Sequence, residues 1–285
     1  MKDKGKFKSV IRNNALYRKF IQKQWYRFVT YLEISKRSRN SNQSLFFSLN
    51  SDRVSAVATL LADEKSKKTY LDMVKFRQTF KKKNFPFSCY EKVQYFIDEL
   101  KLNNNEVFID CGAFDGDTID NFLKHCINYK QIIAFEPQIE LFATLKKKYD
   151  NNSKINLINA GVFDKDGEVL FFEGSYSDSK IVDETTEKSG NNIVEIKVKT
   201  IDGLNLQNVS FIKMDIEGSE YNALKGAQKT ILRDKPKLAI SIYHSDEDMI
   251  RIAEYIHELV PEYKFYIRQH QPYPIHYDTV LYALL

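Results

Sequence analysis

Short apolar runs that end in acidic residues mark out the second half of the chain. Three apolar residues run into Asp110, and a turn with two glycines follows before apolar positions recur at helical spacing. Apolar runs that end at Phe135 and Met214 are likewise followed by Glu136 and Asp215. Such runs, each followed by helical spacing, predict buried strands that alternate with helices, which is typical of an α/β fold with a mostly parallel sheet.

Hydrophobic periodicity predicts further elements on both sides of these strands. Helices are expected at 16–32, 54–80, 90–100, 119–125, 141–149, 219–232 and 249–260, and strands at 155–162, 169–172, 193–200, 237–244, 265–267 and 279–284. Residues 35–52 are rich in Ser, Asn and Arg and predict a linker, with Ser51 or Asp52 as the cap of the next helix. Residues 164–167 predict a hairpin turn, and residues 174–192 a polar loop that either covers a site or lies on the surface.

Length and composition are those of a globular protein with a sizeable core. The chain has 285 residues, of which 43% are hydrophobic and 28% charged. We expect a helical N-terminal extension over residues 1–100 and an α/β domain over residues 101–285. Three cysteines without a C-x-x-C pair argue against a disulfide framework or a zinc site, and they fit a reducing, cytoplasmic compartment. The sequence shows no apolar run of membrane-spanning length and no signal-peptide core.

Basic residues crowd the first forty positions, whereas the region around Asp110 is acidic. The net charge of +5 is therefore weak evidence for a nucleic-acid partner, and we expect none. Apolar residues recur at helical spacing from Leu16 to Leu32, with Arg18 and Lys19 among the basic residues between them. This pattern suits either a helix that rests on a membrane surface or an anionic glycolipid, or an accessory helix that packs on the core or on a second copy of the chain. We favour the accessory helix.

The turn after Asp110 is the first stretch with a chemical signal. Gly112 and Gly116 permit turn angles and the close approach of a ligand, and ligands bind at this end of the strands in open α/β sheets. A phosphate-binding turn would carry Lys or Ser beside its glycines. This turn instead carries Asp110, Asp115 and Asp117 and no cation. It therefore favours a ligand with hydroxyl groups and positive charge.

Three motifs resemble those of the FkbM family of S-adenosylmethionine-dependent methyltransferases. They are D-C-G-A-F-D-G-D-T at 110–118, F-E-P at 135–137 and F-I-K-M-D-I-E-G-S-E at 211–220. L-A-D-E-x-S at 61–66 also resembles the region before the catalytic domain in that family. The resemblance, which covers about residues 54–285, implies a Rossmann-like class I methyltransferase sheet that is mostly parallel with an antiparallel end strand. It also implies S-adenosyl-L-methionine as the cofactor.

The resemblance also implies a set of cofactor-binding residues. They are Asp110, Gly112, Ala113, Phe114, Asp115, Thr118, Glu136, Pro137, Ala160, Val162 and Asp215. Glu136 is expected to accept hydrogen bonds from the two ribose hydroxyls, because a carboxylate can accept both. Asn159, Ala160 and Val162 fall in the loop that lies against the adenine in the family.

The acceptor suggested by the resemblance is a hydroxyl group, often on a sugar of a surface glycan or a secreted metabolite. A hydroxyl must lose its proton during attack, and His244 is the first candidate for the base because its ordinary pKa lies near neutrality. Asp215 and Glu217 are candidates for the base or the acceptor anchor, directly or through a bound cation, but no metal-ligand set can be assigned. His270 and His276 lie in a Pro- and Tyr-rich loop, where they either shape the acceptor pocket or lie on the surface, and we favour the surface.

Three other functions stay open at this point. An NAD-dependent Rossmann oxidoreductase would need G-x-G-x-x-G, and Asp115 and Asp117 would repel its pyrophosphate. A nucleic-acid methyltransferase would need a basic face with stacking aromatic residues, and no N-P-P-Y-type motif lies near Asp215. An inactive glycan- or membrane-binding module is disfavoured because the whole motif set is present.

Overall fold

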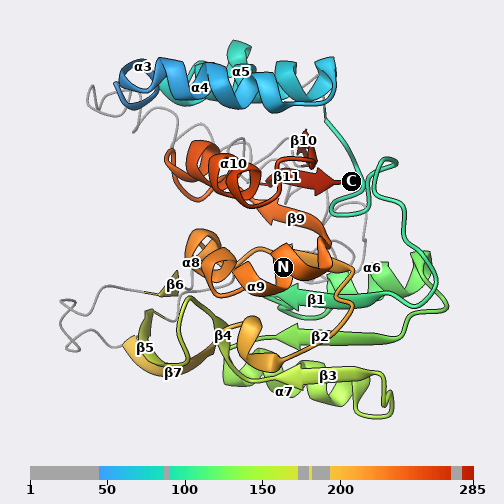
Figure 1. Cartoon of the computed structure of the whole chain (residues 1–285). Coiled ribbons are helices and arrows are strands. Elements are labelled where there is room, and N and C mark those ends of the chain that lie inside the picture. The colour runs from blue at the N-terminus through green and yellow to red at the C-terminus, as the bar shows by residue number, and fades with distance from the viewer. Residues whose placement is uncertain (1–44, 87–89, 173–179, 182–192, 271–277) are drawn as a thin grey trace, which may run out of the picture.

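A central sheet of seven strands organises the chain. The computed structural model describes residues 45–86, 90–172, 180–181, 193–270 and 278–285. The strands of the central sheet are β1 (Val107–Cys111), β2 (Gln131–Phe135), β3 (Ile155–Ile158), β8 (Phe211–Met214), β9 (Lys237–Ser241), β10 (Lys264–Gln269) and β11 (Thr279–Leu284). Their order in space is β10-β11-β9-β8-β1-β2-β3 (Figure 1). Strand β1, which carries the first motif, therefore lies between β8 and β2.

The pairing of the strands confirms the predicted fold class. β1 pairs in parallel with β2 and β8, and β3 and β9 continue the parallel sheet outward. β11 runs antiparallel to both β9 and β10. The connecting helices are α6 (Asp117–His125), α7 (Ile139–Tyr149), α8 (Glu220–Lys225), α9 (Gln228–Asp234) and α10 (Asp248–Leu259). Because parallel strands all end at one edge, the acids that follow β1, β2 and β8 are brought to the same edge.

Apolar side chains fill the space on both faces of the sheet. On one face Ile109 and Ile212 belong to the same core as α8 and α10, and on the other Phe108 and Phe211 belong to a core with α6 and α7. Phe108 stacks at 4.7 Å on both Phe122 and Phe211. Burial on both faces explains why β1 and β8 read as continuous apolar runs in the sequence.

Among the residues that the structure describes, three α-helices precede the sheet: α3 (Phe46–Leu49), α4 (Ser51–Leu60) and α5 (Glu64–Thr79). The single helix predicted at 54–80 is thus wrong, because Leu61 is extended and Asp63 begins a new helix by accepting a 2.6 Å hydrogen bond from the backbone of Ser66. The linker prediction is wrong from residue 46 onward, since α3 and the start of α4 occupy it. Neither Ser51 nor Asp52 caps α4, because the helix begins at Ser51 and follows Asn50.

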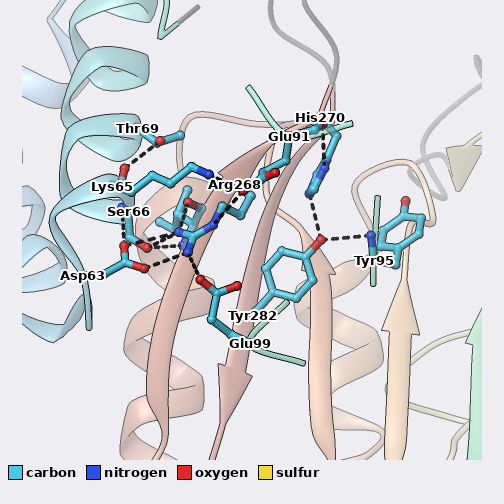
Figure 2. Close-up of polar contacts among 11 residues, drawn as sticks. Asp63, Lys65, Ser66, Thr69, Glu91, Tyr95, Glu99, Arg268, His270 and Tyr282 are labelled. Carbon is cyan, nitrogen blue, oxygen red and sulfur yellow. Dashed lines mark hydrogen bonds and ion pairs between the residues drawn. The ribbon is translucent and has the colours of Figure 1, made fainter. Parts of the chain in front are cut away.

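Buried Arg268 on β10 fixes α5 to the edge of the sheet (Figure 2). Its side chain is 1% exposed, and its guanidinium lies 2.7 Å from Asp63 and 2.5 Å from Glu99. It also donates to the hydroxyl of Ser66 at 2.6 Å. Burial lowers the pKa of Arg268, but these carboxylates outweigh burial and raise it above its ordinary value. The α5 helix is therefore joined to the sheet by a buried charged group as well as by apolar packing.

The helix predicted at 90–100 is wrong, because this segment is irregular. Tyr95 has a left-handed backbone with φ 65°, which a continuing helix excludes. Its backbone N–H donates to the hydroxyl of Tyr282 at 3.0 Å (Figure 2). Tyr90 forms an isolated β-bridge with Gln269. Tyr95, Phe96, Ile97 and Leu100 are buried, whereas Val93 is 43% exposed, so burial along the segment follows no helical period.

A second, smaller sheet contains β4 (Gly161–Val162), β5 (Gly167–Phe172), β6 (Lys180–Ile181) and β7 (Ile193–Lys199) in the order β4-β7-β5-β6. The single strand predicted at 155–162 is therefore divided between two sheets. The hairpin predicted at 164–167 is wrong, because β4 and β5 both pair with β7 and not with each other. The helix predicted at 219–232 is interrupted at Gly226, where a Cβ would lie 2.0 Å from the carbonyl oxygen of Phe163.

Some predictions concern parts of the chain outside the described residues. These are the helix at 16–32, most of the loop at 174–192, and His276. Within the described ranges, no helix combines the length and the apolar character needed to cross a membrane.

Candidate functional site

Backbone hydrogen bonds hold the ends of β1, β2 and β8 together. The N–H of Asp215 donates to the carbonyl of Cys111 at 3.1 Å. The N–H groups of Gly112 and Ala113 both donate to the carbonyl of Phe135, at 3.1 and 2.9 Å. The three acids predicted at the strand ends are thus attached to one connected piece of backbone.

Gly112 stands where the first turn touches the loop after β8. Its φ is +80°, and a Cβ on it would lie 2.1 Å from the carbonyl oxygen of Asp215. At Gly116, with φ +86°, a Cβ would lie 2.5 Å from the hydroxyl of Tyr149. Both positions need glycine for backbone angle and for space, as the sequence predicts.

Asp110 is buried beside a lysine that comes from the neighbouring strand. The carboxylate is 0% exposed, and its Oδ1 lies 3.1 Å from Nζ of Lys213, which is 3% exposed. Nζ also donates to the carbonyl of Gly112 at 2.7 Å. Burial raises the pKa of Asp110 to about 6, although Lys213 opposes this. Burial lowers the pKa of Lys213, but Asp110 and Asp215 outweigh it and raise the pKa above its ordinary value. The turn after Asp110 carries no basic residue, as the sequence predicts, but Lys213 on the neighbouring strand β8 places a positive charge beside it.

Glu136 links the first turn to the end of β2. The residue is 5% exposed; its Oε2 accepts from the N–H of Phe114 and its Oε1 from the N–H of Gln138, each at 2.9 Å. Burial raises the pKa of Glu136 to about 7, although the two backbone N–H groups oppose this. Each carboxylate oxygen has two lone pairs, so both can accept a further hydrogen bond from a ligand hydroxyl.

His244 lies among three carboxylates at the ends of β8 and β9. Its Nδ1 is 3.1 Å from Glu220, and its Nε2 is 3.2 Å from Glu217 and 3.7 Å from Asp215. Burial alone would lower the pKa of His244, but the carboxylates of Glu220, Glu217 and Asp215 raise it well above its ordinary value. A protonated imidazole cannot accept another proton, so His244 must first lose one before it can serve as the predicted base.

The family of the chain follows from a sequence match over the same region. The model of the methyltransferase FkbM domain matches residues 110–265, which is more than half of the chain. The chain belongs to the FkbM methyltransferase family. The resemblance carried by the three motifs is thereby confirmed.

One solved structure agrees with this assignment. The chain is similar to methyltransferase FkbM from Methylobacillus flagellatus KT, with 27% identity and a TM-score of 0.69 over 84% of the chain, and it spans 60% of that protein. A more distant match is an rRNA methylase from Streptococcus thermophilus, with 15% identity and a TM-score of 0.40, over 64% of this chain and 87% of that protein. Another is Aeropyrum pernix fibrillarin in complex with natively bound S-adenosyl-L-methionine, with 11% identity and a TM-score of 0.41, over 66% of this chain and 70% of that protein. These two are too distant to inform function. No curated protein matches the chain.

Two tyrosines that sequence reasoning missed flank Asp215 of this FkbM chain. Tyr95 donates to Oδ2 at 2.7 Å and Tyr243 donates to Oδ1 at 3.0 Å. Burial, together with the charge of Asp215, raises the pKa of both hydroxyls well above the ordinary value, so both remain donors. The position of Tyr243 at the end of β9, beside His244, was a signal that could have found it. Tyr95 gave no signal, because its segment was expected to be helical.

The other predicted cofactor residues of the FkbM motifs differ in exposure. Ala113, Thr118, Ala160 and Val162 are buried, Pro137 is partly buried, and Phe114 and Asp115 are exposed. Asn159 donates from its side chain to the carbonyl groups of Glu136 and Pro137, at 2.9 and 3.0 Å. The contacts of these residues with a cofactor stay predictions.

The surface placement predicted for His270 is wrong. The residue is 3% exposed, and its Nε2 lies 2.8 Å from the hydroxyl of Tyr282 (Figure 2). Burial lowers its pKa to about 4, so it is neutral at ordinary pH. It belongs to the polar contacts that hold the segment of Tyr95 in place, and not to a surface loop.

Proposed function

We propose that this FkbM chain is an S-adenosylmethionine-dependent O-methyltransferase that methylates a hydroxyl group of a sugar in a surface glycan or a related metabolite. The observation that carries the proposal is the meeting of Asp110, Glu136 and Asp215 at the ends of three adjacent parallel strands. Gly112 and Gly116 bring the first turn close against the loop after β8 and against Tyr149, which fixes the backbone beside these acids. Family membership supports methyl transfer as the reaction.

The charges at this edge suit the methyl donor. S-adenosylmethionine carries a sulfonium, an ammonium group and two ribose hydroxyls. Glu136 offers both carboxylate oxygens to the hydroxyls, and Asp110 and Asp215 are anionic groups near a positively charged donor. Lys213 offsets part of the charge of Asp110, so Asp215 and the acids around His244 supply the larger share of the negative potential.

Methyl transfer to a hydroxyl also needs a group that takes the acceptor proton. The oxygen attacks the methyl carbon, the carbon–sulfur bond breaks, and the hydroxyl proton must pass to a base. Burial raises the pKa of Glu217, although His244 opposes this, and its side chain is 28% exposed. Glu217 is therefore the better placed acceptor of the proton, with His244 as the group that orients it.

The two alternative catalytic functions have weaker support. A nicotinamide cofactor would bring a pyrophosphate to a turn that carries Asp110, Asp115 and Asp117. For a nucleic-acid substrate, the described residues around Asp215 supply carboxylates where phosphate contacts would need cations.

Thermal unfolding with S-adenosylhomocysteine and with NAD in parallel tests the cofactor. We expect a rise in melting temperature with S-adenosylhomocysteine only, since a ligand that binds only the folded state stabilises it. A rise with NAD only would reject the methyltransferase proposal. Mass spectrometry of surface glycans from a deletion strain then tests the acceptor, and a missing methyl group is the expected result.

A further inference from the structure

We propose that Asp215, Glu220 and His244 bind a divalent metal ion at the ends of β8 and β9. Each of the three side chains offers one ligand atom, and these atoms all lie within 4.8 Å of one another. Asp215 follows β8, Glu220 opens α8, and His244 follows β9. Parallel strands and a helix start therefore position the three groups before any ligand arrives. The proposed binding does not depend on the proposed methyl transfer.

Two of these side chains are buried and carry polar atoms without hydrogen bonds. Glu220 is 0% exposed; its Oε1 accepts from the N–H of Ile216 at 2.8 Å, while its Oε2 has no partner among the described residues. The side chain of His244 is 9% exposed, and neither ring nitrogen makes an aligned hydrogen bond to a described group. A buried polar atom without a partner costs about 1–3 kcal/mol. A bound ion would satisfy Glu220 Oε2 and one ring nitrogen of His244, and the other nitrogen would then carry a proton and face a carboxylate.

The ligand atoms lie close enough together for one ion after small shifts of the side chains. Only one ring nitrogen of His244 can bind the ion: Nδ1 lies 3.1 Å from Glu220 Oε1, and Nε2, on the other side of the ring, lies 3.7 Å from Asp215 Oδ1. Bonds of about 2.0–2.2 Å to the metal place neighbouring ligand atoms about 3–3.6 Å apart. Carboxylates combined with imidazole favour Mn²⁺ or Zn²⁺ over Ca²⁺, which takes oxygen ligands.

The balance of charge favours a cation at this place. Three carboxylates, those of Asp215, Glu217 and Glu220, surround a single histidine. Glu217 is 28% exposed and lies at the outer side of the group. The competing arrangement is a protonated His244 that bridges Glu217 and Glu220 without an ion. A nitrogen of His244 that binds a metal ion must be unprotonated. That nitrogen can therefore either bind the ion or carry the proton that bridges to a carboxylate, but not both.

The tyrosine hydroxyls on Asp215 have the placement of outer partners of a metal ligand. Tyr95 and Tyr243 donate to the two oxygens of Asp215 and fix its orientation. Outer partners of this kind typically change metal affinity by about 10- to 100-fold when removed. If the proposed methyl transfer also holds, the ion would bind the acceptor hydroxyl and lower its pKa, and the proton would pass to Glu217.

Titration of the full chain with MnCl₂ tests the ion site without any methyl donor. Calorimetry and the loss of the free Mn²⁺ electron paramagnetic resonance signal should both report one ion per chain. We expect Asp215→Asn and Glu220→Gln to weaken binding at least tenfold, and Tyr243→Phe about tenfold, with circular dichroism to confirm folding. The matched control is Glu258→Gln, in a surface pocket that Glu247 and Glu254 also line, and it should leave the affinity unchanged.

Two outcomes would overturn the ion site. One is a folded chain that binds no Mn²⁺ at about 1 mM, which would favour the protonated His244 arrangement. The other is binding that Glu258→Gln weakens as much as the variants at Asp215 and Glu220 do. Pulsed resonance should show nitrogen coupling to the bound Mn²⁺ that disappears in His244→Gln. Binding of Mn²⁺ without methyl transfer would reject only the proposed function, and methyl transfer by a chain that binds no ion would reject only the ion site.

Discussion

Replacement of Lys213 by methionine should destabilise the protein far more than loss of an exposed lysine. Lys213 and Asp110 are 3% and 0% exposed and 3.1 Å apart, so the substitution leaves a buried carboxylate without its cation. Breaking a buried pair from one side typically costs about 3–5 kcal/mol. This corresponds to a fall in melting temperature of about 6–20 °C for a chain of this size.

The cost of Lys213→Met should also depend on pH, because Asp110 can take up a proton. Its pKa is about 6 in the folded protein with Lys213 present, above the ordinary value of 3.8. When the pKa of a carboxyl group is higher in the folded than in the unfolded protein, the protein loses stability as the pH rises through the folded pKa, because the proton that favoured the folded state is released. Without Lys213 the pKa of Asp110 in the folded protein rises further. Between the two folded pKa values only the variant keeps Asp110 protonated, and each pH unit in that range adds about 1.4 kcal/mol to the loss of unfolding free energy caused by Lys213→Met. The variant should therefore be nearest to the wild type at about pH 5 and furthest at about pH 8.

Urea unfolding at these two pH values measures the effect. The control is Lys67→Met, which removes an exposed i,i+3 pair with Glu64 and should change stability by less than about 0.5 kcal/mol. The double variant with Asp110→Asn should cost less than the sum of the two single variants, because no unpaired charge remains. A cost that equals that of Lys67→Met, or that does not change with pH, would refute the reasoning.

Two further substitutions test other parts of the structure. At about pH 8, where Glu136 with its pKa of about 7 is mostly ionised, Glu136→Ala should weaken S-adenosylhomocysteine binding about tenfold to a hundredfold while the chain stays folded, because hydrogen bonds to a charged group are lost. Unchanged affinity by calorimetry would remove Glu136 from the ribose role. Arg268→Met should lower the free energy of unfolding, measured by chemical denaturation, by about 2–3 kcal/mol, because Asp63 and Glu99 lose their shared partner. A loss no greater than that of Lys67→Met would show that α5 is held by apolar packing alone.

The central sheet was predictable because its strands are buried on both faces. β1, β2, β8 and β9 appear in the sequence as short apolar runs, and the acids after three of them meet because parallel strands share an end. The segment of Tyr95 misled the same reasoning, since its apolar residues fall at helical spacing in the sequence, although its backbone is irregular and Val93 is exposed. Apolar spacing alone does not report the conformation of the backbone.

The charged partners within the site were harder to predict. Lys213 stands inside an apolar run, so no pattern marks it as the partner of a residue 103 positions earlier in the chain. Glu220 lies within the third motif, yet its contact with His244 depends on where α8 begins relative to β9. Pairings of this kind are set by the tertiary arrangement, which periodicity along one chain does not contain.

The contact between Gly112 and the carbonyl of Asp215 would limit how the acceptor specificity of the proposed enzyme can change. No side-chain atom fits between them, so the backbone of the first turn and that of the loop after β8 have to move together. If the proposed function holds, a new acceptor could not be accommodated by retreat of that loop without disturbance of the turn proposed to face the methyl donor. Changes in substrate preference would then have to come instead from side chains that border the loop.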